Sequence, residues 1–401
     1  MLVYIKFCCG DQGLMSVLVT NASNAKGLVV TQSLGKQGVE ITTTDCEKLS
    51  AAFFSRYSKH HFVCASPEKS PLEFANSIIN YLKRKKIDVL MPINSTETNI
   101  ISKYKEKFTP YTKVPFEDFP KMMQLNDKNE VMKLASELDI RIPETFEMEN
   151  VKNLETFSKQ INYPIVIKLR NATSSVGISY VHSPQEFISK YKYTIQKFNL
   201  EPSNYPVVQE YIPGNGYGVS MLYNSGDIRA LFTHKRLREF PITGGPSTLR
   251  VSVRHPEMEK AAKKLLDHVG WHGVAMVEFK LDERNNKPVL IEVNPRFWGS
   301  VFQAIASGVN FPYLLYEMAL NGDVKPVFNY KIGIKTRFFL NDFRALISQM
   351  KNPDNRTQTF KEFFKFYEKG LYYDTFSIDD MLPAVMFTYK GLNELLNSKY
   401  K

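Results

Sequence analysis

Apolar runs of β-branched residues alternate with helix-like segments in the first quarter of the chain. These strand-like and helix-like stretches follow one another at residues 16–20, 28–38, 39–45, 72–85 and 87–94. Strands that are apolar on both faces are typical of a parallel sheet covered by helices on both sides. The pattern therefore predicts a doubly wound α/β domain over residues 15–113.

The hydrophobic pattern changes after this first domain. A helix is predicted at 127–138, and Pro143 prevents it from continuing much further. Strand patterns then dominate from 160 to 295, joined by polar turns that suit antiparallel neighbours. Helical patterns return towards the C-terminus. The chain is thus expected to contain a second, α+β region at 114–325 and a helix-rich tail at 326–401.

The charge of the chain narrows the classes of ligand. Its 401 residues carry a formal net charge of +11, which suits an anionic partner. The basic residues are dispersed, and the one short basic run, 83–86, ends a helix-like segment, where the helix dipole favours cations. We therefore expect an anionic small molecule and no nucleic acid. No apolar run approaches the roughly 18 residues that a membrane helix needs, so no membrane partner is expected.

The cysteines and the first residues favour a cytoplasmic protein. The four cysteines form no C-x-x-C pair and no cluster with histidine at zinc spacing, which fits a reducing compartment without disulfides or structural metal. The first fourteen residues are too short for a signal peptide, and Met15 directly precedes the first strand pattern. We expect residues 1–14 to be an extension from an upstream start.

Acidic and amide side chains interrupt two consecutive apolar strands. Glu278 lies late in one strand pattern, and Glu292 and Asn294 lie late in the next. The short polar turn between the strands predicts a hairpin, which brings all three side chains onto one face. Two carboxylates and an amide oxygen are hard ligands that suit Mg²⁺ and, through it, phosphate oxygens. The alternative is that Lys280 and Arg296 neutralise the glutamates in ordinary salt bridges.

Two lysines and a polar turn upstream are suited to binding phosphates. Lys168 lies among apolar residues, where a lysine needs an anion or a lowered pKa. Lys128 lies in the first turn of a predicted helix, whose N–H groups add to an anion site. The hydroxyl-rich turn RNATSSVG at 170–177 is long enough to fold over phosphates. Taken singly, each lysine also fits a surface residue whose stem covers apolar neighbours.

The segment VVQEYIPG, at 207–214, has the form of a strand that runs into a turn. Backbone groups of Glu210 and Ile212 could pair with the edge of an adenine ring, and the Gln209 side chain could reach its exocyclic amine. An ordinary edge strand fits the segment equally well.

The order of these motifs resembles the ATP-grasp superfamily, which includes biotin carboxylase and D-alanine–D-alanine ligase. The resemblance covers roughly residues 15–325. Its pieces are NDK at 126–128, PIVIKLRNATSSVG at 164–177, VQEYIPG at 208–214, VEFK at 277–280 and IEVNPRFWGS at 291–300. It implies an ATP-grasp domain at 114–325, with a lid subdomain at about 145–212, preceded by the α/β domain that is found in the family.

The resemblance also implies roles for residues at matched positions. Lys128 and Lys168 would contact the phosphates of ATP, and Arg296 would meet the substrate carboxylate or its acyl phosphate. Lys168 and Arg296 are therefore the expected catalytic residues. The remaining matched positions are the lid residues Ser174, Ser175, Val176 and Gly177, the adenine-binding residues Gln209, Glu210 and Ile212, and the ligands Glu278, Glu292 and Asn294 of two Mg²⁺ ions, for which Mn²⁺ is an alternative. The lid departs from many members in having a single glycine.

Further polar residues fit two interpretations each. In ligases of this kind the strand and loop equivalent to 233–250 flank the phosphate and the acceptor, so Arg236, Arg238 and Arg250 are candidates for binding an anionic substrate; a solvated charged strand is the alternative. Polar residues at strand ends of the first domain fit either substrate contact or loop capping, namely Asn21, Asn94, Ser95 and Glu97.

The function implied is that of an ADP-forming ligase that makes a C–N bond. A substrate carboxylate would attack the γ-phosphorus of ATP, and an amine would then displace phosphate from the acyl phosphate. The expected partners are a small carboxylic acid and an amine, and a homodimer is left open. The chain has no biotin- or lipoyl-type sequence, which argues against a carboxylase. A small-molecule kinase and a non-catalytic ATP-binding protein of the same fold are the alternatives.

Overall fold

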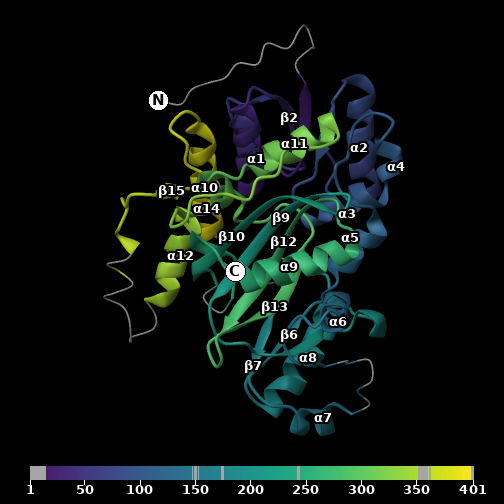
Figure 1. Cartoon of the computed structure of the whole chain (residues 1–401), viewed down its shortest axis with the longest axis vertical. Helices are drawn as coiled ribbons and strands as arrows, with labels where there is room; N and C mark the ends of the chain where they lie inside the picture. The colour runs from purple at the N-terminus through teal and green to yellow at the C-terminus, as the bar shows by residue number, and fades with distance from the viewer. Residues whose placement is uncertain are drawn as a thin grey trace.

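The chain folds into sheets with helices packed around them. The computed structural model describes residues 15–146, 148, 151, 153–172, 176–241, 244–350, 360 and 363–398. Within these residues three sheets follow one another along the long axis, with the N-terminal sheet at one end, a large sheet in the middle and a small sheet at the other end (Figure 1). The mixed α/β fold expected from the sequence is confirmed.

The N-terminal sheet is parallel, with the strand order β3-β2-β1-β4. Its strands are β1 (Ser16–Val19), β2 (Glu40–Asp45), β3 (Ser58–Val63) and β4 (Val89–Met91). β1 and β4 are buried along their whole length, as their continuous apolar runs predict. The hydrophobic pattern does not predict β3, because this edge strand is largely exposed and its sequence, SKHHFV, is mostly polar.

Two helices of the N-terminal region begin at the same edge of its sheet. The helical elements here are α1 (Ala25–Gly35), η1 (Ala51–Phe54), α2 (Pro71–Arg84), α3 (Ser95–Lys103) and α4 (Lys105–Phe108). α1 follows β1, and its N-cap Asn24 accepts a hydrogen bond from the backbone N–H of Lys26. α3 follows β4, which pairs with β1. The N-termini of α1 and α3 therefore lie together at the carboxyl edge of the sheet, where open α/β sheets bind ligands.

The central sheet has the strand order β13-β12-β9-β10-β11-β14-β15. Its strands are β9 (Gly216–Asn224), β10 (Asp227–Glu239), β11 (Ser247–Val253), β12 (Gly273–Asp282), β13 (Lys287–Asn294), β14 (Lys335–Arg337) and β15 (Leu371–Tyr373). The helices around it are α5 (Phe119–Asn126), α6 (Lys128–Glu137), α9 (Pro256–Val269), α10 (Val301–Ser307) and α11 (Phe311–Asn321). One apolar core joins this sheet to the N-terminal sheet, which fixes the two relative to each other.

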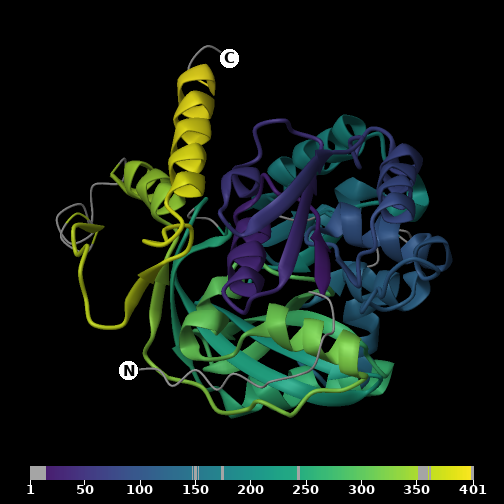
Figure 2. The ribbon, with the colours of Figure 1, turned by 90° about the horizontal axis from the view of Figure 1, so that it is seen from above.

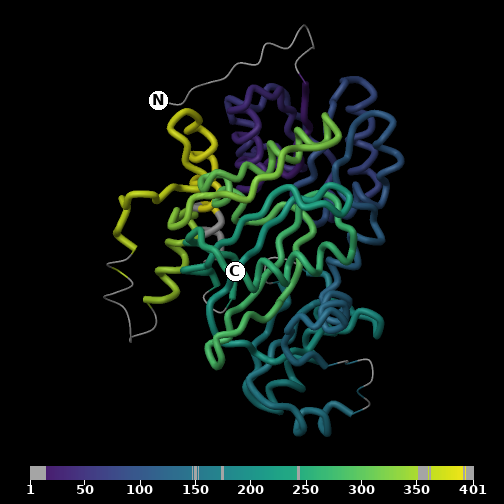
Figure 3. The backbone as a smooth tube through the Cα atoms, viewed as in Figure 1, coloured from purple at the N-terminus to yellow at the C-terminus, as the bar shows by residue number. Residues whose placement is uncertain are grey.

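The small sheet is antiparallel, with the order β5-β8-β6-β7, and has an apolar core of its own. Its strands and helices are β5 (Thr145–Phe146), α7 (Leu154–Gln160), β6 (Ile165–Lys168), β7 (Ser179–Val181), α8 (Pro184–Phe198), η3 (Pro202–Asn204) and β8 (Val207–Glu210). The tube in Figure 3 follows the chain from the N-terminal region down into this sheet and back to the centre.

The C-terminal tail is helix-rich, as expected, but it also extends the central sheet. Strands β14 and β15 add to its edge, α12 (Phe339–Gln349) contacts β10 and β11, and α14 (Leu382–Ser398) contacts η1. Figure 2 shows α14 standing beside the N-terminal region. Among the described helices, α14 included, none is both long and apolar enough to cross a membrane.

Asp342 fastens the tail to the central sheet. The residue is 1% exposed, and its carboxylate accepts hydrogen bonds from Arg238, Thr248 and Arg337 at 2.6–2.8 Å. We expect Asp342→Asn to lower the free energy of unfolding by about 2 kcal/mol, because charged hydrogen bonds are lost in a buried site. Urea denaturation measures the change.

The matched control for Asp342 is Asp323→Asn. Asp323 pairs with Arg229, but its side chain is 53% exposed, so removing this exposed pair should change the stability much less. Equal losses of stability in the two variants would show that the tail does not depend on Asp342.

Candidate active site

A cavity of about 380 Å³ lies where the three sheets and the tail meet. Its walls come from the start of α1, from β6 and β7 of the small sheet, from β10 to β13 of the central sheet and from α12 of the tail. The hairpin β12–β13 forms its floor of acidic side chains, and cations approach from the other elements. The cavity thus collects residues that lie up to about 350 positions apart in the chain, from Asn24 to Asp374.

The hairpin β12–β13 brings the three predicted oxygen donors together. Glu278 lies opposite Glu292 in the strand register, and Met276 lies opposite Asn294. Because side chains alternate along a strand, Glu278, Glu292 and Asn294 share one face. Asn294 Nδ2 donates to Glu278 Oε1 at 2.9 Å and to Glu292 Oε1 at 3.5 Å. All three residues line the cavity.

The cations that pair with Glu278 and Glu292 are not Lys280 and Arg296, the two partners that the salt-bridge alternative requires. Glu278 bonds Arg236, and Glu292 lies 3.3 Å from Lys128 Nζ. Lys280 Nζ instead donates to the Ile212 carbonyl at 2.9 Å. Salt bridges of the glutamates with Lys280 and Arg296 are therefore wrong as an explanation. The actual partners come from other elements, as expected where several elements converge on one ligand.

Burial and neighbouring charges set the protonation of this floor. Burial, opposed by Arg236 and assisted by Glu292, raises the pKa of Glu278. Burial acts in the same direction on Glu292, but Lys128 and Lys168 outweigh it and lower the pKa of that carboxyl group. Two facing carboxylates thus repel each other, and a divalent cation between them would relieve the repulsion.

The donor set fits a hard divalent cation. Carboxylates such as Glu278 and Glu292 are ligands that Mg²⁺ prefers when it also binds phosphates and water. Asn294 turns its Nδ2 to these carboxylates and its Oδ1 to Arg296, so its oxygen would reach an ion beside them only after the amide rotates. Among the described residues, no group of three or more histidine, cysteine, aspartate or glutamate side chains forms a denser metal site. Two carboxylates without such a cage suit an ion that arrives with its nucleotide.

Lys168 lies on β6 and faces the cavity from the small sheet. The residue is 8% exposed, and its Nζ donates to Gln209 Oε1 at 2.9 Å. Burial lowers its pKa from the usual value to about 8, although the charge of Glu292 counteracts part of the shift. Bound phosphate would stabilise the charged form and raise this pKa again.

Lys128 begins α6 and joins the small sheet to the acidic floor. Its Nζ donates to the Ala172 carbonyl at 2.8 Å and lies 3.3 Å from Glu292. The expectation that N–H groups of this helix add to an anion site needs correction. The side chain of the N-cap Asp127 already accepts from the N–H groups of Asn129 and Glu130. Lys128 contributes through its ammonium group.

The predicted phosphate loop is described only at its end. Ser174 and Ser175 lie outside the described residues. Val176 lines the cavity and is 52% exposed, and Gly177 follows at φ +71°. A side chain at Gly177 would meet Leu169, so glycine is required both by the backbone angle and by the close approach.

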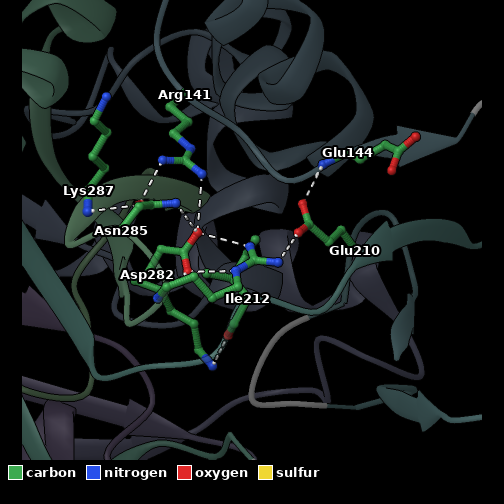
Figure 4. Close-up of polar contacts among 9 residues, drawn as sticks. Arg141, Glu144, Glu210, Ile212, Asp282, Asn285 and Lys287 are labelled. Carbon is green, nitrogen blue, oxygen red and sulfur yellow. Dashed lines mark hydrogen bonds and ion pairs between the residues drawn. The ribbon is translucent and has the colours of Figure 1, made fainter. Parts of the chain in front are cut away.

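The strand–turn segment expected to hold adenine is fixed by a network of polar contacts (Figure 4). The Glu210 carboxylate faces Arg284, at 2.6 Å, and accepts from the Glu144 N–H. Glu210 and Ile212 line the cavity, whereas Gln209 is fully buried behind it. The Gln209 amide bonds Lys168 and Thr145, so its side chain supports Lys168.

The three candidate arginines lie in different settings. Arg236 lines the cavity, and Glu278 and Glu239 raise its pKa despite its burial. Arg250 lines it too, but its guanidinium bonds Thr336, Ser247 and Asp374. Arg238 is not among the cavity residues and bonds Asp342 of α12.

Arg296 connects the acidic floor with the N-terminal sheet. The residue is 6% exposed, and its guanidinium donates to Asn294 Oδ1, at 2.6 Å, and to the Ser95 hydroxyl. Of the polar strand-end residues, Asn94 accepts from Lys26 Nζ at 2.9 Å, and Asn21 donates to Glu97. The loop-capping alternative for Asn94 and Ser95 is thus replaced by contacts with cavity cations.

Sequence reasoning missed residues at both ends of the cavity. Lys26, at the start of α1, is 8% exposed and lines it. The tail supplies Phe338, Asn341 and Asp374, although no chemistry was predicted for residues 326–401. A lysine two residues after the N-cap Asn24, in the first turn of the first helix, is the available signal for Lys26. No signal in the sequence indicated the tail residues.

Comparisons with known proteins agree on the type of fold. Residues 204–337 match a family model described as "ATP-grasp in the biosynthetic pathway with Ter operon". The D-aspartate ligase of Enterococcus faecium is 22% identical over 287 residues, which cover 66% of this chain and 67% of that protein. An acetyl-CoA carboxylase of Schizosaccharomyces pombe also matches, but the alignment spans only 7% of its length.

Two solved structures with similar folds were determined as complexes with nucleotides. A biotin carboxylase–β-γ-ATP complex from Campylobacter jejuni superposes with a TM-score of 0.65 at 14% identity, over 80% of this chain and 74% of that one. N5-carboxyaminoimidazole synthetase from Staphylococcus aureus, complexed with ADP, superposes with a TM-score of 0.62 at 13% identity, over 87% of each chain.

Proposed function

This chain has the ATP-grasp fold, and on that premise we propose that it is an ATP- and Mg²⁺-dependent ligase that joins a carboxylic acid to an amine. The observation that carries the proposal is the meeting, in one cavity, of two facing carboxylates, Glu278 and Glu292, with Lys128 and Lys168. Acids for a metal and cations for phosphates are the two requirements of phosphoryl transfer from ATP.

The first step is phosphoryl transfer to the substrate carboxylate. A carboxylate oxygen attacks the γ-phosphorus of ATP, the bond to the β–γ bridging oxygen breaks, and ADP leaves with that electron pair. Lys168 and Lys128 would hold the phosphoryl oxygens as charge gathers on them. Mg²⁺ held by Glu278, Glu292 and Asn294 would supply further neutralisation of the phosphates when bound.

The second step forms the amide bond. The amine nitrogen attacks the carbonyl carbon of the acyl phosphate, inorganic phosphate leaves with the C–O electron pair, and one proton is released from nitrogen. Arg296 would orient the carboxylate, because its planar guanidinium is anchored by Asn294 and Ser95. The loop that ends at Gly177 would cover the intermediate against water.

The direct test is a screen of amino acids and small acids, with and without amines, for ADP formation from ATP. Mass analysis then identifies any joined product. The proposal predicts free inorganic phosphate and an amide in equal amounts. Phosphate that stays on an organic product would indicate a small-molecule kinase instead, and ATP binding without ADP formation in any mixture would indicate a non-catalytic protein.

The lowered pKa of Lys168 makes ATP binding pH-dependent. The free protein holds this lysine charged below about pH 8 and neutral above it, whereas phosphate binds the charged form. Affinity for ATP is thus expected to be level below about pH 8 and then to fall by up to about tenfold per pH unit, as binding must take up a proton. Calorimetry in buffers of different ionisation enthalpy measures both the affinity for ATP and the number of protons taken up on binding. Lys168→Arg should remove the dependence in this range.

A further inference from the structure

Two buried cations lie at the N-terminal side of the cavity, beyond the acidic floor. Lys26 comes from the start of α1 and is 8% exposed, and Arg296 follows β13 and is 6% exposed. Both line the cavity. Within the described residues they are linked through consecutive residues of the β4–α3 junction, because Lys26 bonds Asn94 and Arg296 bonds Ser95.

Neither cation forms a salt bridge with an acid among the described residues, although burial lowers the pKa of Arg296 and the charges of Glu292, Glu278 and Glu97 offset part of that effect. The hydrogen-bond acceptors of Arg296 are the Ser95 hydroxyl, the Phe297 carbonyl and the Asn294 amide, and Lys26 bonds the Asn94 amide. Lys128 and Arg236 differ in this respect, since each pairs with a glutamate, whereas Lys168, on the small-sheet side, bonds the Gln209 amide. Burying charges without a counter-ion is costly, so this pair of cations is suited to an anion from outside the chain.

The environment of Lys26 also favours the binding of an anion. Burial and the positive charge of Arg296 lower its pKa well below the usual range, and the charge of Glu97 offsets only part of the effect. Glu97 is itself buried, is bonded by Asn21 and is not among the cavity residues. An anion beside Lys26 would restore its charged form.

The triphosphate of ATP has its own cations, on the opposite side of the floor. Lys128 and Lys168 bond groups that belong to the small sheet and its loop, Ala172 and Gln209. Arg296 lies between these two lysines and Lys26, because it bonds Asn294 of the acidic hairpin and Ser95 of the N-terminal region. Lys26 is therefore placed beyond the reacting carboxylate as seen from ATP.

From this order we infer that Lys26 binds a second carboxylate of the donor substrate, which makes the donor a dicarboxylic acid. The reacting carboxylate lies at Arg296 and the other at Lys26. The two cations bond consecutive residues, Asn94 and Ser95, and line the same cavity, so we expect one short dicarboxylate to reach both. The inference rests on the proposed ligase function for the assignment of the reacting end.

The kinetic test uses hydroxylamine as the acceptor, because this small amine traps an acyl phosphate as a hydroxamate. Two pairs of acids differ only in the second carboxylate: succinate against butyrate, and aspartate against 2-aminobutyrate in both enantiomers. The wild-type protein should prefer the dicarboxylate of at least one pair. Lys26→Met should lower kcat/KM for that acid about thirtyfold and leave the monocarboxylate within about twofold.

The matched control is Lys36→Met, directly after α1. Lys36 lies outside the cavity and pairs with Asp379 of the tail, so this variant should retain the preference for dicarboxylates. The inference is overturned if wild type turns over the monocarboxylates as well as the dicarboxylates. It is also overturned if Lys26→Met lowers both classes alike, since a structural lysine would do that.

Measurements of acid binding without ATP test the dicarboxylate site independently of the proposed ligase function. Calorimetry with succinate and butyrate, without ATP, should show succinate binding that Lys26→Met abolishes and Lys36→Met retains. Lys26-dependent binding without any hydroxamate would support the dicarboxylate site and overturn the ligase. Hydroxamate from monocarboxylates alone, with no succinate binding, would support the ligase and overturn the site.

Discussion

Replacement of Glu292 by alanine is expected to lower Mg²⁺-dependent ADP formation about a thousandfold while the protein stays folded. Glu292 faces Glu278 across the hairpin and is held by Lys128. Its removal leaves one carboxylate for the metal and frees Lys128 from its counter-ion, so both the charge and the position of the triphosphate change. Steady-state rates over a range of Mg²⁺ concentrations measure the effect.

The fold should tolerate this change, because the Glu292 side chain is 27% exposed and belongs to the cavity rather than to the apolar core. Glu257→Ala, at an exposed position in the first turn of α9, provides a matched loss of one carboxylate and should retain full activity. Undiminished Mg²⁺-dependent turnover in Glu292→Ala, with an intact thermal transition, would remove this carboxylate from the mechanism.

Lys168→Met should lower kcat/KM for ATP about a hundredfold, the second largest effect we expect. Methionine fills similar space, but it cannot donate to phosphate oxygens and leaves Gln209 Oε1 without the Lys168 hydrogen bond. Because Lys168 lies at the small-sheet side of the cavity, the loss should appear in the KM for ATP and in kcat, and less in the KM for the acid. Initial rates measured with each substrate varied in turn separate the KM for ATP, the KM for the acid and kcat.

The control for Lys168 is Lys159→Met, an exposed lysine at the end of α7 in the same small sheet region. It should keep the kinetics of the wild type. If Lys168→Met bound ATP normally and lost only stability, the lysine would have a structural role in holding Gln209 and β8, and the phosphate assignment would fail.

The strands that carry the acids could be predicted because their patterns are local. The two strand patterns that carry Glu278 and Glu292 coincide with β12 and β13, and alternation placed Glu278, Glu292 and Asn294 on one face. The partners of these acids could not be predicted in the same way. Arg236 and Lys128 reach them from β10 and α6, and the spacing of residues in sequence says nothing about such distant approaches.

The edge strands of the sheets could be predicted less well from the sequence than the central strands. β3 is exposed and polar, and β14 and β15 have three residues each, so no hydrophobic period marks them. They are strands because a neighbouring strand offers them hydrogen bonds. For the same reason the tail was expected only as helices, although it closes one end of the cavity with Phe338, Asn341 and Asp374.

The sequence by itself determined the parallel α/β start, the acidic hairpin and the positions of Lys128, Lys168 and Arg296, since each follows from a local pattern of burial, alternation or motif. Only the tertiary structure decided which charges meet. It paired Glu278 with Arg236, assigned Gln209 to Lys168, and placed Lys26 near Arg296 with no salt-bridging acid in the described part of the chain. The reason is physical: the energy of a buried charge depends on every group that packs around it, and packing brings together residues whose separation along the chain carries no information about distance.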